Sequence, residues 1–365
     1  MKIALLAESV KDEPIFGTSV YAHNLIKGLI QQKEDLSLIY LDPPKINGFT
    51  GSKVRSYRFC GLPFPGQKIA DWRLLKIANE YDVLHDPSGN DMPLGCTKSK
   101  KIITLHSLGP LESPQYFKER HVRAWDKVRL IQLQEADAII VVTDYEKENL
   151  LRWFPDLNKN KVYPVMLGVD PKIFNPDRKG VDSPLSRPYI LYVGAISPAK
   201  GLLDLVKSFA RICDRIPHYL CLVGAEWLGT EQVLKEISKL GLKDRILWYG
   251  AISHDELPRY YANADVTVQV SYYETYCLPI LEAMACGSPV ITSNILSLKR
   301  MYGDMTMQFQ TGDQEAIAEA IVRVLSDKTS RINLIANGLK YAQAHTWKST
   351  VEQTIRVYRE VCQVA

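Results

Sequence analysis

Short apolar runs rich in β-branched residues alternate with helical patterns along this 365-residue chain. The apolar runs lie at 2–8, 37–41, 54–57, 82–85, 101–105 and 138–142, and then at 189–196, 218–223, 245–249, 266–270 and 289–294. The helical patterns lie at about 19–30, 70–79, 120–135, 145–153, 202–212, 230–240, 255–262, 314–326, 330–344 and 349–364. Because strands that alternate with helices form parallel sheets covered on both faces, the pattern predicts an α/β protein of Rossmann-like units.

The length favours two such domains rather than one. Between the two series of strands, residues 171–188 contain four prolines, which interrupt regular structure and predict a linker. We therefore expect an N-terminal domain over 1–170, a C-terminal domain over 189–345 and a final helix over 346–365.

Composition excludes several classes of protein. The chain is 46% hydrophobic and 24% charged, with a net charge of +4, which gives no indication of a nucleic-acid partner. No apolar run is long enough to span a membrane, and the N-terminal run is too short for a secretory signal. Seven scattered cysteines without a C-x-x-C pair suggest neither a disulfide framework nor a zinc site. We expect a cytoplasmic protein.

The stretch ETYCLPILEAMACG at 274–287 carries the clearest chemistry, because Glu274 and Glu282 stand eight residues apart in it. Glu274 follows the apolar run at 266–270 and should lie in a loop. Pro279 suits the first turn of a helix and Gly287 its end, which places Glu282 about one turn inside.

A helix start offers unpaired amides and a partial positive charge, so the amides of Tyr276, Cys277 and Leu278 form a candidate cradle for phosphate oxygens. Two carboxylates beside a phosphate site suit a ligand with hydroxyl groups on both sides of its phosphates, because carboxylates accept hydrogen bonds from hydroxyls. A nucleotide sugar has this layout.

The E-x7-E spacing and the LPxLEAMACGxPV pattern closely resemble the retaining, family 4 type glycosyltransferases of the GT-B fold, and the resemblance extends over nearly the whole chain. It implies two Rossmann-like domains whose parallel sheets face each other across a cleft, with the final helix packing back on the N-terminal domain. It also implies that Glu274 contacts the donor sugar and Glu282 the ribose. The family usually has glycine where this chain has Thr275 and Cys277.

In the N-terminal half, the resemblance implies that the loop with Gly17 and Thr18 lies under the donor diphosphate, although Gly17 also suits an ordinary turn. His106, at the end of a predicted strand, matches a family histidine that contacts the donor sugar. The alternative is a structural histidine that ties the strand end to its loop. Relatives often have Asp where this chain has Leu108.

In the C-terminal half, Lys200 lies near a predicted helix start, where a lysine can neutralise a diphosphate leaving group without a metal. The alternative is a surface lysine. Relatives commonly place an arginine where this chain has Gly194 and Ala195, and we count Gly194 among the donor-binding positions. Trp227 either stacks on the nucleotide base or packs against the protein.

Two further features have less specific interpretations. His85 and Asp86 are expected to form a hydrogen-bonded pair near the acceptor. The basic helix at 118–130 is either a solvated face or a peripheral contact with the inner face of a membrane that holds a lipid-linked acceptor.

Together these features predict a glycosyltransferase that moves a hexose from a nucleotide diphosphate sugar to a hydroxyl of a saccharide or lipid-linked acceptor. The donor is expected to be UDP-glucose first and GDP-mannose second. No D-x-D motif is present near a strand end, so we expect no metal requirement and no cofactor. A glycosidase is disfavoured because Glu282 is inside a helix beside a phosphate-type cradle. A non-catalytic binder of sugar nucleotides is the alternative.

Overall fold

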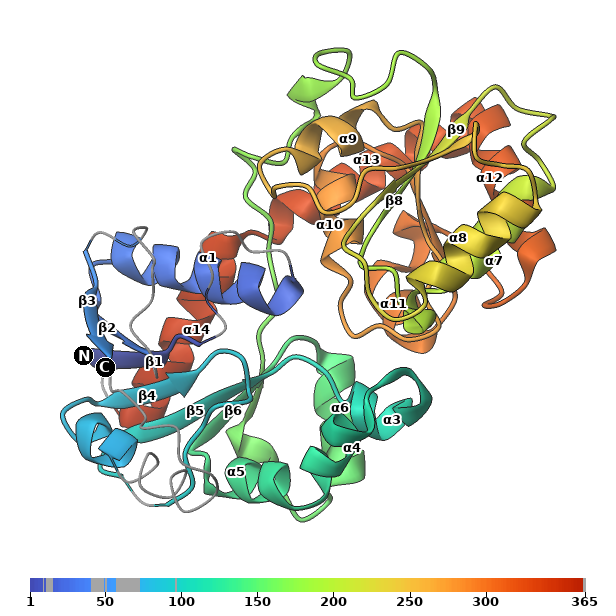
Figure 1. Cartoon of the computed structure of the whole chain (residues 1–365). Coiled ribbons are helices and arrows are strands. Elements are labelled where there is room, and N and C mark those ends of the chain that lie inside the picture. Colours follow the sequence, from blue (N-terminus) through green and yellow to red (C-terminus); the bar gives the residue numbers. More distant parts are fainter. Residues whose placement is uncertain are drawn as a thin grey trace. The chain divides into compact units, whose positions relative to one another are not determined.

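The computed structural model describes residues 1–8, 10, 16–40, 49, 51–56, 73–95 and 97–363. The chain divides into two units, one made of Met1–Leu167 with Trp347–Ala365 and the other of Gly168–Thr346 (Figure 1). The chain therefore passes from the first unit to the second and returns for its last helix. Residues 171–188, which the sequence predicts as a linker, are part of the second unit.

The first unit contains a parallel sheet of seven described strands in the order β3-β2-β1-β4-β5-β6-β7. Its strands are β1 (Lys2–Leu6), β2 (Asp35–Tyr40), β3 (Lys53–Ser56), β4 (Val83–Asp86), β5 (Lys100–Leu105), β6 (Ala138–Val141) and β7 (Val162–Pro164). The apolar runs predicted from the sequence form β1 to β6. Strand β7 was not predicted, because it is three residues long and ends in Pro164, a residue that is uncommon in strands.

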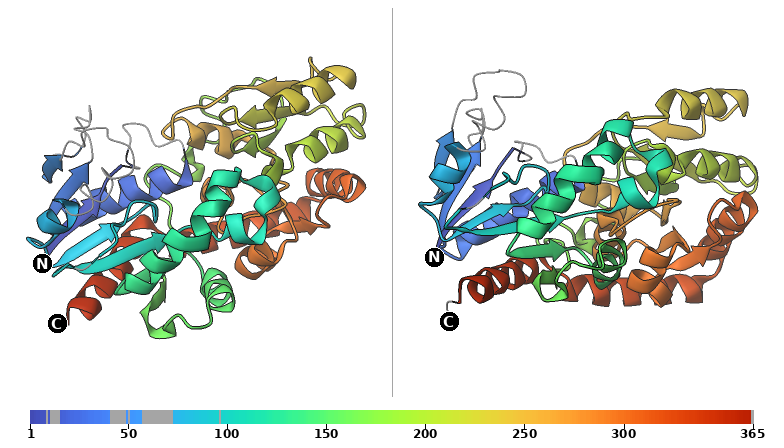
Figure 2. Two further views of the ribbon diagram at one scale, coloured as in Figure 1. Left: turned by 60° about the horizontal axis from the view of Figure 1, so that its bottom comes forward. Right: turned by 90° about the horizontal axis from the view of Figure 1, so that it is seen from below.

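The helices of the first unit are α1 (Gly17–Gln31), α3 (Gly109–Glu112), α4 (Glu119–Ala124), α5 (Leu130–Glu135), α6 (Asp144–Trp153) and α14 (Trp347–Cys362). Residues 73–78 are also helical, while Cys60, Cys96 and the start of the helix expected at 70–79 lie outside the described residues. The single helix expected at 120–135 is divided by a π-helical turn at Trp125–Arg129. In Figures 1 and 2 the red helix α14 lies among the blue and cyan elements of this unit.

The second unit contains a parallel sheet of six strands in the order β10-β9-β8-β11-β12-β13. The strands are β8 (Tyr189–Val193), β9 (Tyr219–Val223), β10 (Ile246–Trp248), β11 (Val266–Gln269), β12 (Val290–Ser293) and β13 (Met307–Phe309). The helices are α7 (Leu202–Ala210), α8 (Thr230–Lys239), α9 (Leu257–Asn263), α10 (Leu278–Ala285), α11 (Leu296–Tyr302), α12 (Gln314–Ser326) and α13 (Lys328–Ala344). The sequence predicts neither β13 nor α11, which are three and seven residues long.

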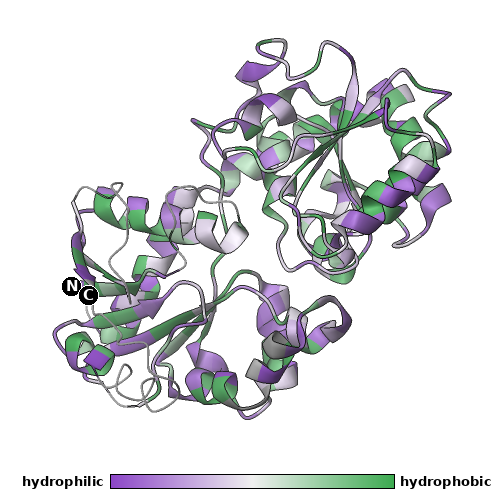
Figure 3. Cartoon of the chain, viewed as in Figure 1, coloured by the Kyte–Doolittle hydropathy of each residue, from purple (hydrophilic) through white to green (hydrophobic). Residues whose placement is uncertain are grey.

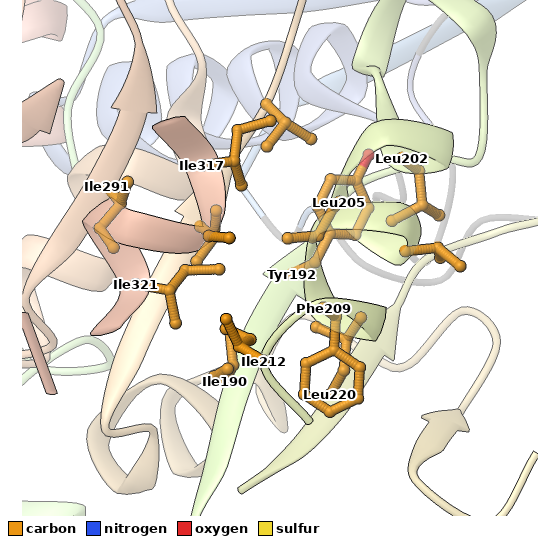
Figure 4. Packing of buried hydrophobic residues seen from close by; sticks show 14 of the residues in the cluster. Ile190, Tyr192, Leu202, Leu205, Phe209, Ile212, Leu220, Ile291, Ile317 and Ile321 are labelled. Carbon is orange, nitrogen blue, oxygen red and sulfur yellow. The ribbon is translucent and has the colours of Figure 1, made fainter. Parts of the chain in front are cut away.

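The core of the second unit lies between its sheet and the helices that cover it. Tyr192 of β8, Phe209 of α7 and Ile321 of α12 are completely buried and belong to one apolar cluster (Figure 4). Hydrophilic and hydrophobic bands alternate along α7 and α8 (Figure 3), as expected for helices with one face on a sheet. This core fixes the carboxyl ends of β8 and β11, from which the loops of the candidate site emerge.

Candidate functional site

The loop at 271–277 connects β11 to α10 and contains the first glutamate of the E-x7-E motif. Helix α10 begins at Leu278 with Pro279 in its first turn, as predicted. Cys277 is the residue before the helix and has φ of 62°, in the left-handed region. Glycine adopts this conformation without steric cost, which gives a physical reason for the glycine that the resembled family has at this position.

Hydroxyl groups from β12 and α11 hold the carbonyl oxygens of this loop. The hydroxyl of Ser293 donates to the carbonyl of Ser271 (2.6 Å), and that of Ser297 donates to the carbonyl of Glu274 (2.7 Å). Tyr302 likewise donates to the carbonyl of Tyr276 at 3.0 Å. These three carbonyl oxygens of the loop are thus hydrogen-bonded within the protein. Helix α11, which the sequence did not predict, supplies two of the three donors.

Three backbone amides, at the end of this loop and the start of α10, are available to a ligand. In the part of the chain that the structure describes, the backbone N–H groups of Thr275, Cys277 and Leu278 have no acceptor. These groups precede or open α10, where the helix dipole adds a partial positive charge. The loop can therefore receive an anion through its amides.

Lys200 and Glu274 are brought together by the fold. The Lys200 ammonium forms an ion pair with Oε1 of Glu274, and the hydroxyl of Ser271 donates to the same oxygen at 3.0 Å. The side chains are 29% and 9% exposed, so water screens the pair only in part. Burial lowers the pKa of Lys200, but the charge of Glu274 and its hydrogen bond outweigh that effect and raise the pKa overall.

Gly201 explains how Lys200 comes so close to the end of β11. Its φ is 65°, and a Cβ atom at this position would lie 2.2 Å from the carbonyl oxygen of Val270. The amide of Tyr272 also donates to the carbonyl of Ala199 at 2.8 Å. Lys200 is the last residue of a 3₁₀ turn (Pro198–Lys200), with α7 beginning two residues later.

Glu282 is about one turn inside α10, as the sequence predicts, and is 5% exposed. The hydroxyl of Tyr261 donates to one carboxylate oxygen at 2.9 Å, and Nε2 of His254 lies 3.0 Å from the other. Phe174 contacts the rings of both partners. Each carboxylate oxygen retains a second lone pair for a further donor. His254 and Tyr261 were not predicted as site residues, because no local sequence pattern marks them.

Thr275, between the two acidic positions, is 7% exposed, and its hydroxyl has no hydrogen-bond partner within the described structure. A buried polar atom without a partner is rare in native proteins and calls for an explanation, such as a ligand or water that completes it. In the same unit, Gly194 and Ala195 follow β8 and are partly exposed, and Trp227 is 48% exposed beyond β9.

The predicted residues of the first unit lie in two places. Gly17 and Thr18 form the first turn of α1, so the expectation of a loop at these positions is wrong. Nε2 of His106 lies 2.7 Å from the carbonyl oxygen of Pro87, and the ring contacts Tyr21 edge-on. Burial lowers the pKa of His106, which makes the ring neutral near pH 7. Leu108 is completely buried in the apolar core.

The expected pair of His85 and Asp86 is not formed. His85 is fully buried, with its ring nitrogens 2.5 Å from the hydroxyl of Tyr358 on α14 and 2.8 Å from that of Thr104. Burial lowers the pKa of His85 to about 3, so it is a neutral core histidine. The Asp86 carboxylate instead accepts hydrogen bonds from the loop that follows β4, including the amides of Gly89 and Met92.

Two models of known protein families match consecutive parts of the chain. Residues 16–173 match the model of the family described as Glycosyltransferase Family 4, and residues 174–341 match the model described as Glycosyl transferases group 1. The chain belongs to the group 1 glycosyltransferases. Its fold is GT-B, as predicted from the sequence.

Relatives of this glycosyltransferase match it over almost its full length. O-antigen chain mannosyltransferase B of Escherichia coli is 27% identical, with 98% of this chain and all of that protein covered. Alpha-maltose-1-phosphate synthase of Mycolicibacterium smegmatis is 26% identical, with 99% of this chain and all of that protein covered. The solved structure of sucrose-phosphate synthase from Thermosynechococcus elongatus has a TM-score of 0.80 and 26% identity, covering 99% of both chains.

Among the described residues, none of the helices of this glycosyltransferase combines the length and the apolar character needed to cross a membrane.

Proposed function

We propose that this glycosyltransferase transfers a hexose from a nucleotide diphosphate sugar to a hydroxyl of a saccharide or lipid-linked acceptor, with retention of the anomeric configuration. The observation that carries the proposal is the loop at 271–277. In this one segment, the amides of Thr275 and Cys277 have no acceptor among the described residues and precede a helix start, and the carboxylate of Glu274 is paired with Lys200. The amides can donate to phosphate oxygens, and the carboxylate can accept hydrogen bonds from hydroxyl groups next to a phosphate.

The roles of the two glutamates follow from their settings. Glu274 lies in the loop beside the amides and suits the transferred sugar. Glu282 lies one turn into the helix, and His254 and Tyr261 orient its carboxylate, which leaves lone pairs for the vicinal hydroxyls of the ribose. A carboxylate held in this way loses little conformational freedom when the ligand binds.

The proposed chemistry relies on the chain's own groups to neutralise the departing diphosphate. Lys200 and the loop amides stabilise the charge that develops on the phosphate oxygens, so no divalent metal is required. His106, neutral and held by Pro87, is proposed to contact the donor sugar from the first unit. The hydroxyl of Thr275, which has no hydrogen-bond partner among the described residues, is proposed to accept a hydrogen bond from the donor or to donate one to it.

The donor is proposed to be UDP-glucose first and GDP-mannose second. The relative from Escherichia coli is named as a mannosyltransferase, which supports including a mannose donor in any screen. A ligand at 100 times its dissociation constant stabilises a protein by about 2.7 kcal/mol, so a thermal-shift screen of nucleotide sugars will identify the donor.

The test of catalysis is release of nucleoside diphosphate from the donor identified in that screen, in the presence of candidate acceptors and with or without EDTA. We expect turnover that EDTA leaves unchanged, and near loss of turnover in Glu274→Ala. Strict dependence on a metal would contradict the proposed chemistry. Binding without turnover for any hydroxyl acceptor would favour the alternative of a non-catalytic sugar-nucleotide-binding protein.

A further inference from the structure

The ion pair between Lys200 and Glu274 has a consequence for what the site binds, provided that the proposed function is correct. Lys200 is the cation assigned to the diphosphate, yet it is already paired with a carboxylate of the same chain, that of Glu274. Glu274 is almost buried, with a side chain only 9% exposed, so its charge is weakly screened by water. Any anion that enters the loop therefore meets a negative charge as well as a positive one.

An intact nucleotide sugar offers hydrogen-bond donors to the carboxylate of Glu274, and the nucleoside diphosphate product does not. In a nucleotide sugar the α-phosphate is esterified to the ribose and the β-phosphate to the sugar, and the hydroxyls of the sugar can donate to Glu274. During transfer the bond between the anomeric carbon and the phosphate oxygen breaks, and its electron pair stays on that oxygen. The acceptor oxygen bonds to the carbon, and the acceptor's proton is released to solvent.

The nucleoside diphosphate that remains has a terminal phosphate with a charge of about −1.5 to −2 at pH 7, because the second pKa of such a group is about 6. It offers no sugar hydroxyl to Glu274. The carboxylate is then left with a like charge nearby, and Lys200 is shared between two acceptors. Like charges that are partly buried repel strongly.

We propose that the Lys200–Glu274 pair makes the site select the intact nucleotide sugar over its own nucleoside diphosphate product, and so promotes release of the product. Ser271 contributes by holding Oε1 of Glu274 at 3.0 Å, on the side where Lys200 binds. In this view Glu274 both orients the sugar before transfer and destabilises the product complex after it.

The test compares dissociation constants of the full-length wild type, Glu274→Gln, Lys200→Ala and the double variant, measured by calorimetry without acceptor. The ligands are UDP and GDP, each with and without its hexose. Glutamine keeps the shape of the side chain and removes its charge. We expect Glu274→Gln to bind the nucleoside diphosphate about tenfold more tightly, a change of about 1.4 kcal/mol, and to bind the nucleotide sugar no more tightly than wild type.

The effect should depend on Lys200 and on ionic strength. In the Lys200→Ala background, the gain in affinity for the nucleoside diphosphate that Glu274→Gln produces should fall to less than half. The reason is that no lysine is then present to be freed from its pairing with Glu274. In wild-type background the gain should shrink at high salt. Glu352→Gln makes the same change of net charge on α14, where Glu352 pairs with Lys348 at 3.9 Å, and should leave all these affinities unchanged.

Two results would overturn the inference while leaving the proposed function intact. One is equal or weaker binding of nucleoside diphosphate by Glu274→Gln, and the other is a gain of the same size with and without Lys200. Glu274→Ala provides a second variant if the glutamine variant does not fold, and it should change affinity in the same direction. Failure of the wild type to bind any nucleotide sugar or nucleoside diphosphate would instead contradict the proposed function itself.

Discussion

Cys277 shows how a single residue connects backbone conformation to the candidate site. It adopts φ of 62° immediately before α10 and is 7% exposed, beside the amides of Thr275 and Leu278, which, like its own, have no acceptor among the described residues. A side chain in the left-handed region clashes with its own backbone, at a cost of about 1–2 kcal/mol. The conformation persists because hydroxyl donors fix the loop immediately before it, at the carbonyls of Glu274 and Tyr276.

Because of this strain, we expect glycine at position 277 to give a more stable protein than alanine, which is the reverse of the usual order. Cys277→Gly and Cys277→Ala both remove the sulfur, and they differ only in the Cβ atom. Alanine normally stabilises a chain relative to glycine, but here the glycine variant should be more stable by about 1 kcal/mol. Urea denaturation of both proteins measures the difference. If the alanine variant proved the more stable, the left-handed conformation at this position would be contradicted.

Glu146 is a second residue whose environment has a measurable consequence. It is completely buried at the start of α6, and one of its carboxylate oxygens accepts a hydrogen bond from the amide of Leu108 at 2.7 Å. Burial, and secondarily the charge of Glu112, raise the pKa of Glu146 to about 8. In the unfolded chain the same carboxyl titrates near its usual pKa of about 4.3.

A raised pKa in the folded state means that the stability contributed by Glu146 is fully present below about pH 4.3 and is lost as the pH rises toward 8. Glu146→Gln keeps the acceptor for Leu108 and removes the titration. Between pH 5 and pH 8 the wild type should therefore lose on the order of a few kcal/mol relative to this variant. Denaturation at several pH values measures the loss, and Glu148→Gln, an exposed position on the same helix, should follow wild type.

At the scale of elements, α14 is attached to the first unit by both apolar and polar contacts. Its Tyr358 reaches His85 of β4, and Thr350 donates to the carbonyl of Met166 at 2.8 Å. Val351 packs against Gly28 of α1, where a Cβ atom would lie 2.4 Å from a valine methyl group. Glycine here allows the two helices to approach closely.

The contact predicts that Gly28→Ala destabilises the protein even though it lies in a helix. Helix propensity alone would make alanine more favourable by about 1 kcal/mol, whereas overpacking costs about 1–3 kcal/mol. In a Val351→Ala background there is room for the new methyl group, so Gly28→Ala should become stabilising. A double-mutant cycle by urea denaturation tests this, and additive effects would show that the two side chains do not meet.

At the scale of the whole molecule, each unit has an apolar cluster of its own, one around Ile139 and Leu84 and the other around Tyr192 and Phe209. The candidate donor-binding groups at 194–282 all belong to the second unit, and His106 belongs to the first. Separate cores allow the units to unfold in separate steps, and a ligand stabilises the unit that holds it.

Calorimetry should therefore resolve two unfolding transitions, of which donor nucleotide at 100 times its dissociation constant stabilises one by about 2.7 kcal/mol. Tyr358→Phe leaves a ring nitrogen of buried His85 without its partner, and should lower the other transition, that of the first unit. If nucleotide raised the transition that Tyr358→Phe lowers, the assignment of the donor to the second unit would be wrong.

Features that depend on neighbouring residues could be predicted from the sequence. Period and β-branched content located β8 and β11, and Pro279 marked the start of α10, because these signals arise within one turn or one strand. The same local spacing placed Glu282 one turn inside the helix. The strands β7 and β13 were missed because β7 ends in a proline and β13 contains no β-branched residue, so that neither has the composition of a strand.

Contacts between groups that are far apart in the chain could not be predicted, because they depend on how the elements pack. Lys200 and Glu274 are 74 positions apart, and their pairing depends on the close approach that Gly201 permits. His85 was expected near the acceptor, yet it bonds to Tyr358, 273 positions away, because α14 covers its strand. Such pairings are set by how sheets and helices pack, which no local pattern records, and they determine whether a polar residue becomes part of the core or of the site.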